Sequence, residues 1–198
     1  MKSKIQLTLL ILPLLLFVQF ASAQVGFGPR AGINLVSAAG KNSSAMFRFG
    51  LHLGAYAKIP VAENLVFQPE LLYSIRGYGY YTGYGYNSTQ RLYYLDVPLL
   101  LNYGTSEGVH FIGGLQPSVL LGAKYIDNGN TTSKGKNKDD YRTMDVAAVV
   151  GVGYQAEEGF NADLRFGYGL FPLLSDDSPN RIHSFCFQLT AGYTFGGK

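Results

Sequence analysis

The stretch FRFGLHLGAYAKI, from Phe47 to Ile59, alternates apolar residues with polar or small ones without a miss. Its apolar members occupy every second position, including Phe49, Leu51 and Leu53. Successive side chains of a β-strand point to opposite sides, so this pattern predicts a strand with one apolar face and one polar face. The same pattern recurs along the chain, which indicates an all-β protein.

Period-two segments cover residues 27–36, 47–59, 65–76, 91–103, 109–124, 145–155, 160–170 and 184–195. Short connections at 60–64, 104–108 and 156–159 alternate with long ones at 37–46, 77–90, 125–144 and 171–183. Outer-membrane barrels join tilted strands of about 9 to 11 residues by short periplasmic turns and longer external loops. The sequence therefore predicts an eight-stranded antiparallel up-and-down transmembrane β-barrel.

Residues 1–23 have the features of a secretory signal peptide, with Lys2 and Lys4 before an apolar run and a small-residue site at 21–23. Cleavage there leaves residues 24–198 as one barrel domain. It removes two of the 16 basic residues and none of the 13 acidic ones, so the mature net charge is near +1. This balance argues against nucleic-acid binding, which needs a clustered basic face. The lone Cys186 allows no disulfide framework.

Charged residues fall on one face of these segments, and the other face is almost uncharged. The charged set is Arg30, Arg48, Lys58, Glu70, Arg76, Asp96, Lys124, Asp145, Asp163 and Arg165, and His52 and His110 share its face. In a lipocalin-like barrel these side chains would point to solvent. An eight-stranded interior is narrow, and the Phe, Leu, Tyr and Val face suits lipid, so we expect the charges inside. Leu53→Arg should then cost about 2 to 4 kcal/mol, whereas the inward change Gly54→Ser should be mild.

Four prolines fall within or at the start of the predicted strands, at positions 29, 69, 98 and 117. A proline cannot donate a hydrogen bond to the ladder of a closed barrel. Each should therefore sit at a bulge, a strand end or a locally wet position.

Several motifs resemble the PorT-type outer-membrane β-barrel family, often labelled "porin family" or "outer membrane protein β-barrel domain". They are RAGIN at 30–34, FQPELLYS at 67–74, YLDVPLLL at 94–101, LRFGYGL at 164–170 and GYTF at 192–195. The resemblance implies a small barrel of the OmpX/OmpA kind in the outer membrane, without a defined activity. It also implies that Tyr193 and Phe195 belong to an assembly signal for the barrel assembly machinery.

The inward charges are nearly balanced, which predicts a networked polar interior; an ion or proton path is the functional alternative. No cluster has zinc-ligand spacing, so we expect no metal and no cofactor. His183, Asp176, Asp177 and Ser175 share one predicted loop and offer a hydrolytic set. No hydrolase motif accompanies them, so we do not expect an enzyme.

The second external loop is the most distinctive, because glycines space Tyr78, Tyr80, Tyr81, Tyr84 and Tyr86. Such rings suit contact with a glycan or a surface protein, although a simple hairpin extension explains the loop as well. We therefore expect an integral outer-membrane protein with a structural or surface-interaction role, surrounded by outer-membrane lipid. The alternatives are a small-solute channel, an accessory subunit of a secretion or envelope machine, and a surface hydrolase.

Overall fold

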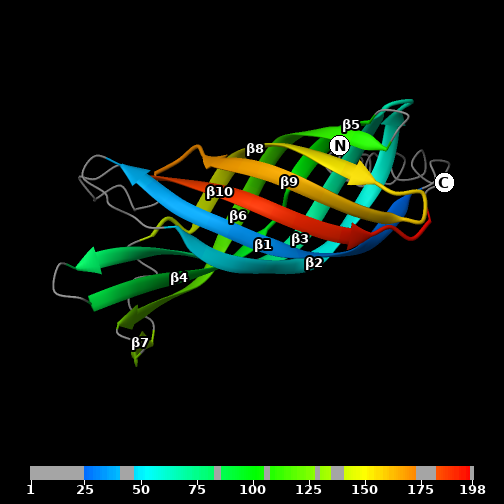
Figure 1. The fold of residues 1–198 in the computed structure, drawn as a ribbon. Helices are drawn as coiled ribbons and strands as arrows, with labels where there is room; N and C mark the ends of the chain where they lie inside the picture. The colour runs from blue at the N-terminus through cyan, green and yellow to red at the C-terminus, as the bar shows by residue number, and fades with distance from the viewer. Residues whose placement is uncertain are drawn as a thin grey trace, which may run out of the picture.

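The computed structural model describes residues 25–40, 47–82, 86–104, 108–127, 130–134, 141–172 and 182–196; for 38–40, 78–82, 86–89, 125–127, 130–134 and 182 it describes the backbone alone. These residues form one antiparallel sheet (Figure 1). Its strands are β1 (Gly26–Gly40), β2 (Arg48–Ala62), β3 (Leu65–Thr82), β4 (Tyr86–Asp96), β5 (Leu99–Gly104), β6 (Val109–Asp127), β7 (Asn130–Lys134), β8 (Met144–Gln155), β9 (Phe160–Gly169) and β10 (Ile182–Tyr193).

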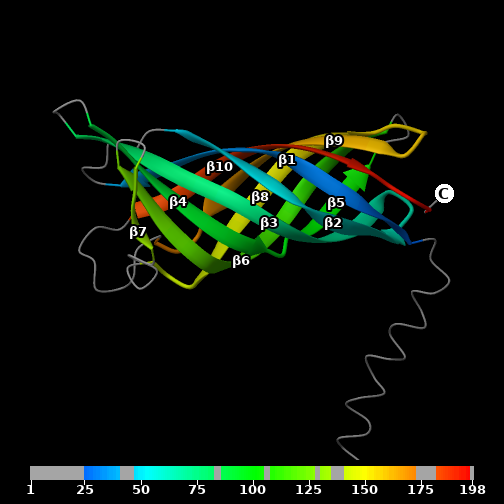
Figure 2. The same ribbon diagram turned by 90° about the horizontal axis from the view of Figure 1, so that it is seen from below.

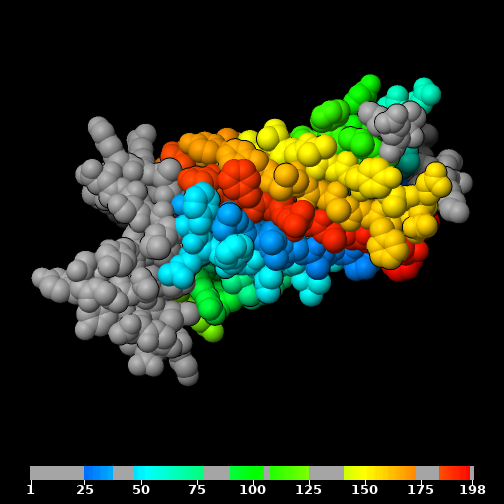
Figure 3. Space-filling model, in the orientation of Figure 1, coloured from blue at the N-terminus to red at the C-terminus, as the bar shows by residue number. Residues whose placement is uncertain are grey.

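The sheet closes on itself as an eight-stranded barrel. The first strand pairs with the last, from Arg30 opposite Gly192 to Gly40 opposite Ile182. β4 and β5 together make one strand of the wall, and the short β7 pairs only with the outer end of β6 among the described strands. Figure 2 shows the oblique course of the strands, and Figure 3 shows the continuous wall formed by β1, β2, β9 and β10. The predicted fold is confirmed.

Apolar side chains cover the outside of this barrel, and charged side chains lie inside. On β2, the outward Phe49 is 78% exposed and Leu53 is 64% exposed. Arg30 and Asp163, which point inward, are each 1% exposed. Burial of charge behind an exposed apolar surface is the reverse of a water-soluble barrel, so the lipocalin-like alternative is wrong.

Aromatic pairs mark both ends of the apolar surface. At the end with short turns, the rings of Phe160 and Tyr193 lie 4.8 Å apart. At the opposite end, the rings of Phe47 and Phe185 lie 5.5 Å apart, and Tyr93 stacks at 6.4 Å on Tyr73, which lies nearer the middle of the wall. Aromatic girdles of this kind flank the lipid-facing band of outer-membrane barrels. By the same rule, the end with long connections is the external one.

Each strand proline lies where the ladder to one neighbour is interrupted. The β1–β10 ladder begins just after Pro29, and the β2–β3 ladder has no pair at Pro69. The wall strand breaks into β4 and β5 at Pro98, and Pro117 lies on β6 opposite that break. There the carbonyl of Pro117 accepts a hydrogen bond from Val97 N–H at 2.8 Å. The missing donors therefore fall at ladder gaps, as the sequence predicts.

Two sequence predictions are wrong. Alternation predicts Lys124 on the inward face, but its side chain is exposed, because the β4–β6 register shifts next to Tyr93 and leaves Leu121 as an extra residue. An extra residue reverses the faces of the strand beyond it. Gly54→Ser is not mild either, because a Cβ at Gly54 would meet the Leu71 carbonyl oxygen and would lie 2.8 Å from the Leu72 Cα.

The connection predicted at 77–90 is mostly strand. β3 and β4 continue as a hairpin beyond the wall, with backbone pairs from Gly77 opposite Arg91 to Thr82 opposite Tyr86. Figure 1 shows this hairpin extending from the external end of the barrel. The hairpin interpretation of this segment is therefore correct for the backbone.

Candidate functional site

Four charged side chains meet in the centre of the barrel, and we call them the central ion cluster: Arg30 from β1, Glu70 from β3, and Asp163 and Arg165 from β9. Arg30 Nη1 donates to Glu70 Oε1 at 2.6 Å and to Asp163 Oδ2 at 2.7 Å. Arg165 Nη2 donates to the same two oxygens at 2.7 Å each, and its Nη1 donates to Glu70 Oε2 at 2.9 Å. All four residues are 1 to 3% exposed. Two cations therefore face two anions without solvent.

Uncharged polar side chains add further hydrogen bonds to this cluster, although the Nε atoms of Arg30 and Arg165 stay without a partner among the described residues. Gln68 Nε2 donates to Glu70 Oε1 at 2.6 Å and its Oε1 accepts from Asn102 Nδ2 at 2.8 Å. Arg30 Nη2 donates to Asn161 Oδ1 at 2.5 Å, and its guanidinium lies 4.4 Å from the centre of the Tyr56 ring. Charges in a low-dielectric interior need such satisfaction to avoid a large desolvation cost.

The two inward histidines sit in different parts of the interior. His110 Nε2 lies 3.1 Å from Asp163 Oδ1, at the edge of the central ion cluster. His52 lies apart from it, with Nδ1 2.8 Å from Asn34 Oδ1 and Nε2 3.1 Å from Thr190 Oγ1. Each imidazole is thus fixed by hydrogen bonds. Among the described residues, no group of three or more His, Cys, Asp or Glu side chains could hold a metal ion.

Glycines on the inward faces make room for this packing. A Cβ at Gly153 would meet Asp163 Oδ1 and His110 Nε2 and would lie 2.7 Å from His110 Cε1. A Cβ at Gly32 would meet the Leu189 carbonyl and lie 2.6 Å from the His52 ring. The alternation of bulky polar residues with glycine therefore lets a narrow barrel hold long charged side chains.

A second ion pair lies in the interior between β3 and β4, outside the central ion cluster. Arg76 Nη2 lies 2.5 Å from Asp96 Oδ2 and 3.4 Å from Ser118 Oγ, and the Arg76 guanidinium sits 4.8 Å from the centre of the Tyr94 ring. Asp145 on β8 is buried on the same inward face.

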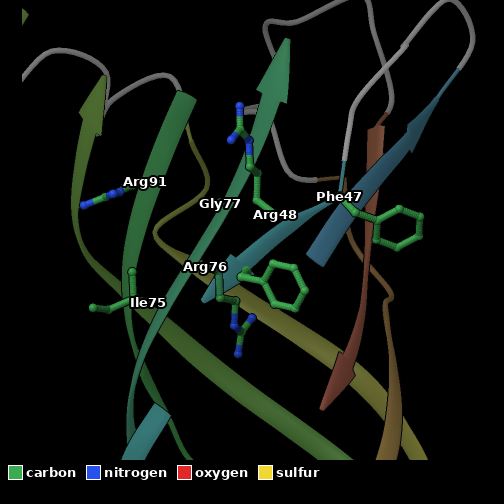
Figure 4. A pocket seen from close by; sticks show the side chains of 7 residues that line it. Phe47, Arg48, Ile75, Arg76, Gly77 and Arg91 are labelled. Carbon is green, nitrogen blue, oxygen red and sulfur yellow. The ribbon is translucent and has the colours of Figure 1, made fainter. Parts of the chain in front are cut away.

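Lys58 and Arg48 lie near the two ends of the interior. Both are half-buried. Lys58 Nζ donates to Gln155 Oε1 at 2.5 Å, near the periplasmic turns. Near the external end, β2 and β3 separate. Figure 4 shows Arg48 and Arg76 pointing in opposite directions there, with Arg91 pointing away from both. Alternation therefore predicts the interior position of these side chains without showing which of them meet.

Two cavities open at the two ends of the barrel. One of about 1140 Å³ lies among the periplasmic turns and reaches inward to Asn102 and His110. The other, of about 290 Å³, lies at the external end, where β2 and β3 separate, and includes Arg48 and Arg76 in its lining. No residue that the structure describes lines both cavities. The central ion cluster lines neither of them.

The remaining predicted site residues are the loop tyrosines and the two aromatic residues Tyr193 and Phe195. The side chains of Tyr78, Tyr80, Tyr81 and Tyr86, and the whole of Tyr84, lie outside the described residues. Tyr193 and Phe195 lie at the periplasmic end with ring centroids 4.9 Å apart. Phe195 also exchanges two backbone hydrogen bonds with Phe27. The assembly role of these two residues stays a prediction.

The candidate hydrolytic set is not assembled in the part of the chain that the structure describes. Residues 175–177 lie outside it, and His183 Nδ1 is 3.0 Å from the Gly169 carbonyl oxygen.

Cys186 is buried. No helix among the described residues is long and apolar enough to cross a membrane.

The polar contacts that alternation does not predict come from amides and hydroxyls, chiefly Gln68, Asn102, Asn161, Asn34 and Thr190. Each lies on the polar face of its segment, so alternation could have placed it inside. Their partners come from strands far apart in the chain, and alternation does not give those distances.

Comparisons with known proteins agree with this architecture. Residues 17–175 match the family described as outer membrane protein beta-barrel domain. A search of curated proteins finds no match.

Among solved structures, the chain is similar to Neisserial surface protein A, with a TM-score of 0.56 and 15% identity over 85% of this chain and 97% of that one. It is also similar to Ail, the attachment invasion locus protein of Yersinia pestis, with a TM-score of 0.51 and 15% identity over 87% and 99% of the two chains. At such identity the structural likeness shows the fold alone. Because the family match spans most of the sequence, the chain belongs to the outer membrane protein β-barrel domain family and is an integral protein of the outer membrane.

Proposed function

We propose that this protein is a non-conducting barrel that acts at the cell surface, in a structural or surface-interaction role. The observation that carries this proposal is the central ion cluster, which ties β1, β3 and β9 together across the lumen. A hydrogen bond to a charged group contributes about 1.5 to 3 kcal/mol, and a continuous solute path would have to break several of them at once. The separation of the two end cavities supports the same conclusion.

With a filled interior, the external segments are where contact with other molecules can occur. The β3–β4 hairpin supports this role, because its paired backbone extends beyond the wall. Its tyrosines suit a glycan or a surface protein as partner, since such rings offer contact area at low entropic cost. This proposal keeps the interior structural and places the function in the hairpin.

Single-channel recording of the purified mature protein in planar bilayers tests the closed interior. We expect no stable ohmic conductance. Glu70→Ala is the matched variant, because it removes the carboxylate that both Arg30 and Arg165 contact. A reproducible unitary conductance in the natural protein, changed by Arg76→Ala, would overturn the proposal and favour a channel.

The small-solute channel is the second candidate, because the two cavities approach the interior from both ends. The roles of secretion accessory subunit and surface hydrolase stay predictions without a specific contact in their favour. Co-purification from intact envelopes tests the first of these, and an activity screen tests the second.

A further inference from the structure

The outward faces of the barrel strands carry two charged side chains among the described residues, and the two lie next to each other. They are Arg91 on β4 and Lys124 on β6, both exposed. Their Cα atoms are direct partners in the β4–β6 ladder, so the side chains share one face. All other Asp, Glu, Lys and Arg side chains that the structure describes in the wall strands point inward or lie at turns.

Two positive charges, those of Arg91 and Lys124, therefore lie directly opposite each other on neighbouring strands. Direct cross-strand pairs of the same sign are destabilising unless an anion lies between them. No ion pair joins either side chain to an acidic residue in the described part of the chain. The Cα of Lys134 on β7 is the next partner of Lys124, so a third basic position continues the row across the strands.

The position of this pair in the membrane identifies the kind of anion. Lys124 Nζ lies 5.5 Å from the centre of the Tyr93 ring, which belongs to the external aromatic girdle and stacks on Tyr73. Tyrosine rings settle at the level of lipid headgroups. Towards the bilayer centre, the outward surface of β6 is apolar and includes Leu121, which is 48% exposed. A ligand here therefore meets cations at headgroup depth and an apolar wall below them.

We propose that Arg91 and Lys124 bind the phosphate group of an anionic lipid in the outer leaflet, with Tyr93 beside the headgroup and Leu121 contacting the acyl chains. This inference depends on the outer-membrane location and does not depend on the proposed closed interior. The register shift at Leu121 is the local cause of the site, because it turns Lys124 outward beside Arg91.

The chain contains no tryptophan, so a single reporter can be placed beside the site. Leu121→Trp puts an indole where the acyl chains of the bound lipid should lie. The protein is reconstituted in phosphatidylcholine vesicles that contain either brominated phosphatidic acid or brominated phosphatidylcholine at equal mole fraction. An anionic surface attracts each nearby Lys or Arg by about 1 kcal/mol, so we expect phosphatidic acid to associate at least about five-fold more strongly than phosphatidylcholine.

Adding Arg91→Gln and Lys124→Gln should abolish this preference. Lys41→Gln with Arg181→Gln removes the same charge from two other positions of the sequence and should preserve the preference. A second reporter, Leu53→Trp, sits on β2, where we expect no preference. Equal quenching of the Leu121→Trp reporter by the two lipids, or equal loss in the control pair, would overturn the proposal.

Two further measurements test whether the variants fold and whether the bound phosphate belongs to a lipid. Arg91→Lys keeps the charge and should keep the preference, which guards against a double variant that does not fold. In the Leu121→Trp protein without further changes, 0.5 M NaCl should weaken the preference by screening. Inorganic phosphate at millimolar concentration should leave the quenching unchanged. If it displaced the lipid where NaCl of equal ionic strength did not, the site would bind free phosphate and the lipid assignment would be wrong.

Discussion

Glu70→Ala is the most informative perturbation of the interior. The Glu70 carboxylate accepts hydrogen bonds from Arg30, from both terminal nitrogens of Arg165 and from Gln68, at 2.6 to 2.9 Å. Its removal leaves two buried cations with one carboxylate, that of Asp163. Breaking a buried pair by removing one partner costs about 3 to 5 kcal/mol, so we expect a loss of unfolding free energy in that range.

A urea titration of the protein refolded in lipid vesicles, followed by its mobility on unheated gels, measures this loss. Glu63→Ala, in an exposed turn, is the matched control and should change the unfolding free energy by less than about 0.5 kcal/mol. The double variant Glu70→Ala with Arg165→Ala should lose less than the sum of the two single variants, because the second change removes one of the orphaned cations. A loss below about 1 kcal/mol for Glu70→Ala, with additive behaviour in the cycle, would refute the view that this cluster holds the interior together.

Three further outcomes follow from the geometry. Leu53→Arg on the lipid-facing side should cost about 2 to 4 kcal/mol in the same titration, whereas Thr190→Ser inside the barrel should cost less than about 1 kcal/mol. Gly153→Val should destabilise the barrel by more than about 1 kcal/mol, because its side chain would enter the space of His110 and Asp163; a neutral effect would contradict the close packing. Deleting residues 78–86 should leave the unfolding midpoint within error and reduce binding of the protein to a surface glycan array or to intact envelopes; an unfolded product would show that the hairpin belongs to the barrel's stability.

Much of this fold follows from period-two alternation, because a closed barrel makes every strand obey the same inside and outside rule. The segment 47–59 is found as β2, and the charged set falls inside with the exception of Lys124. Lys124 is the exception because Leu121 is an extra residue in its strand. The sequence does not reveal this extra residue, since the Leu, Leu and Gly around it suit either face of a strand. The same limit applies to Gly54, whose missing side chain reflects the approach of a neighbouring strand rather than its own polarity.

The contacts of the interior are less accessible to sequence reasoning. Alternation states that Arg30, Glu70 and Arg165 point inward, but it does not give their heights along the barrel axis. That height depends on strand tilt and on the register of each ladder, and bulges or proline gaps change it. The partners of Arg30 therefore emerge only when β1, β3 and β9 are placed around a common lumen.

The closure of the barrel has a kinetic consequence. Because Arg30 pairs with Gly192, the ladder that seals the wall joins residues from opposite ends of the barrel sequence. Such long-range contacts raise contact order and slow folding, because the chain loses the entropy of loop closure before the pairing of the two strands can stabilise the barrel. Until β10 arrives, β1 presents an unpaired edge with an apolar face, which is a site for association with other chains. We therefore expect the chain to be prone to association during its passage to the membrane, until its first and last strands meet.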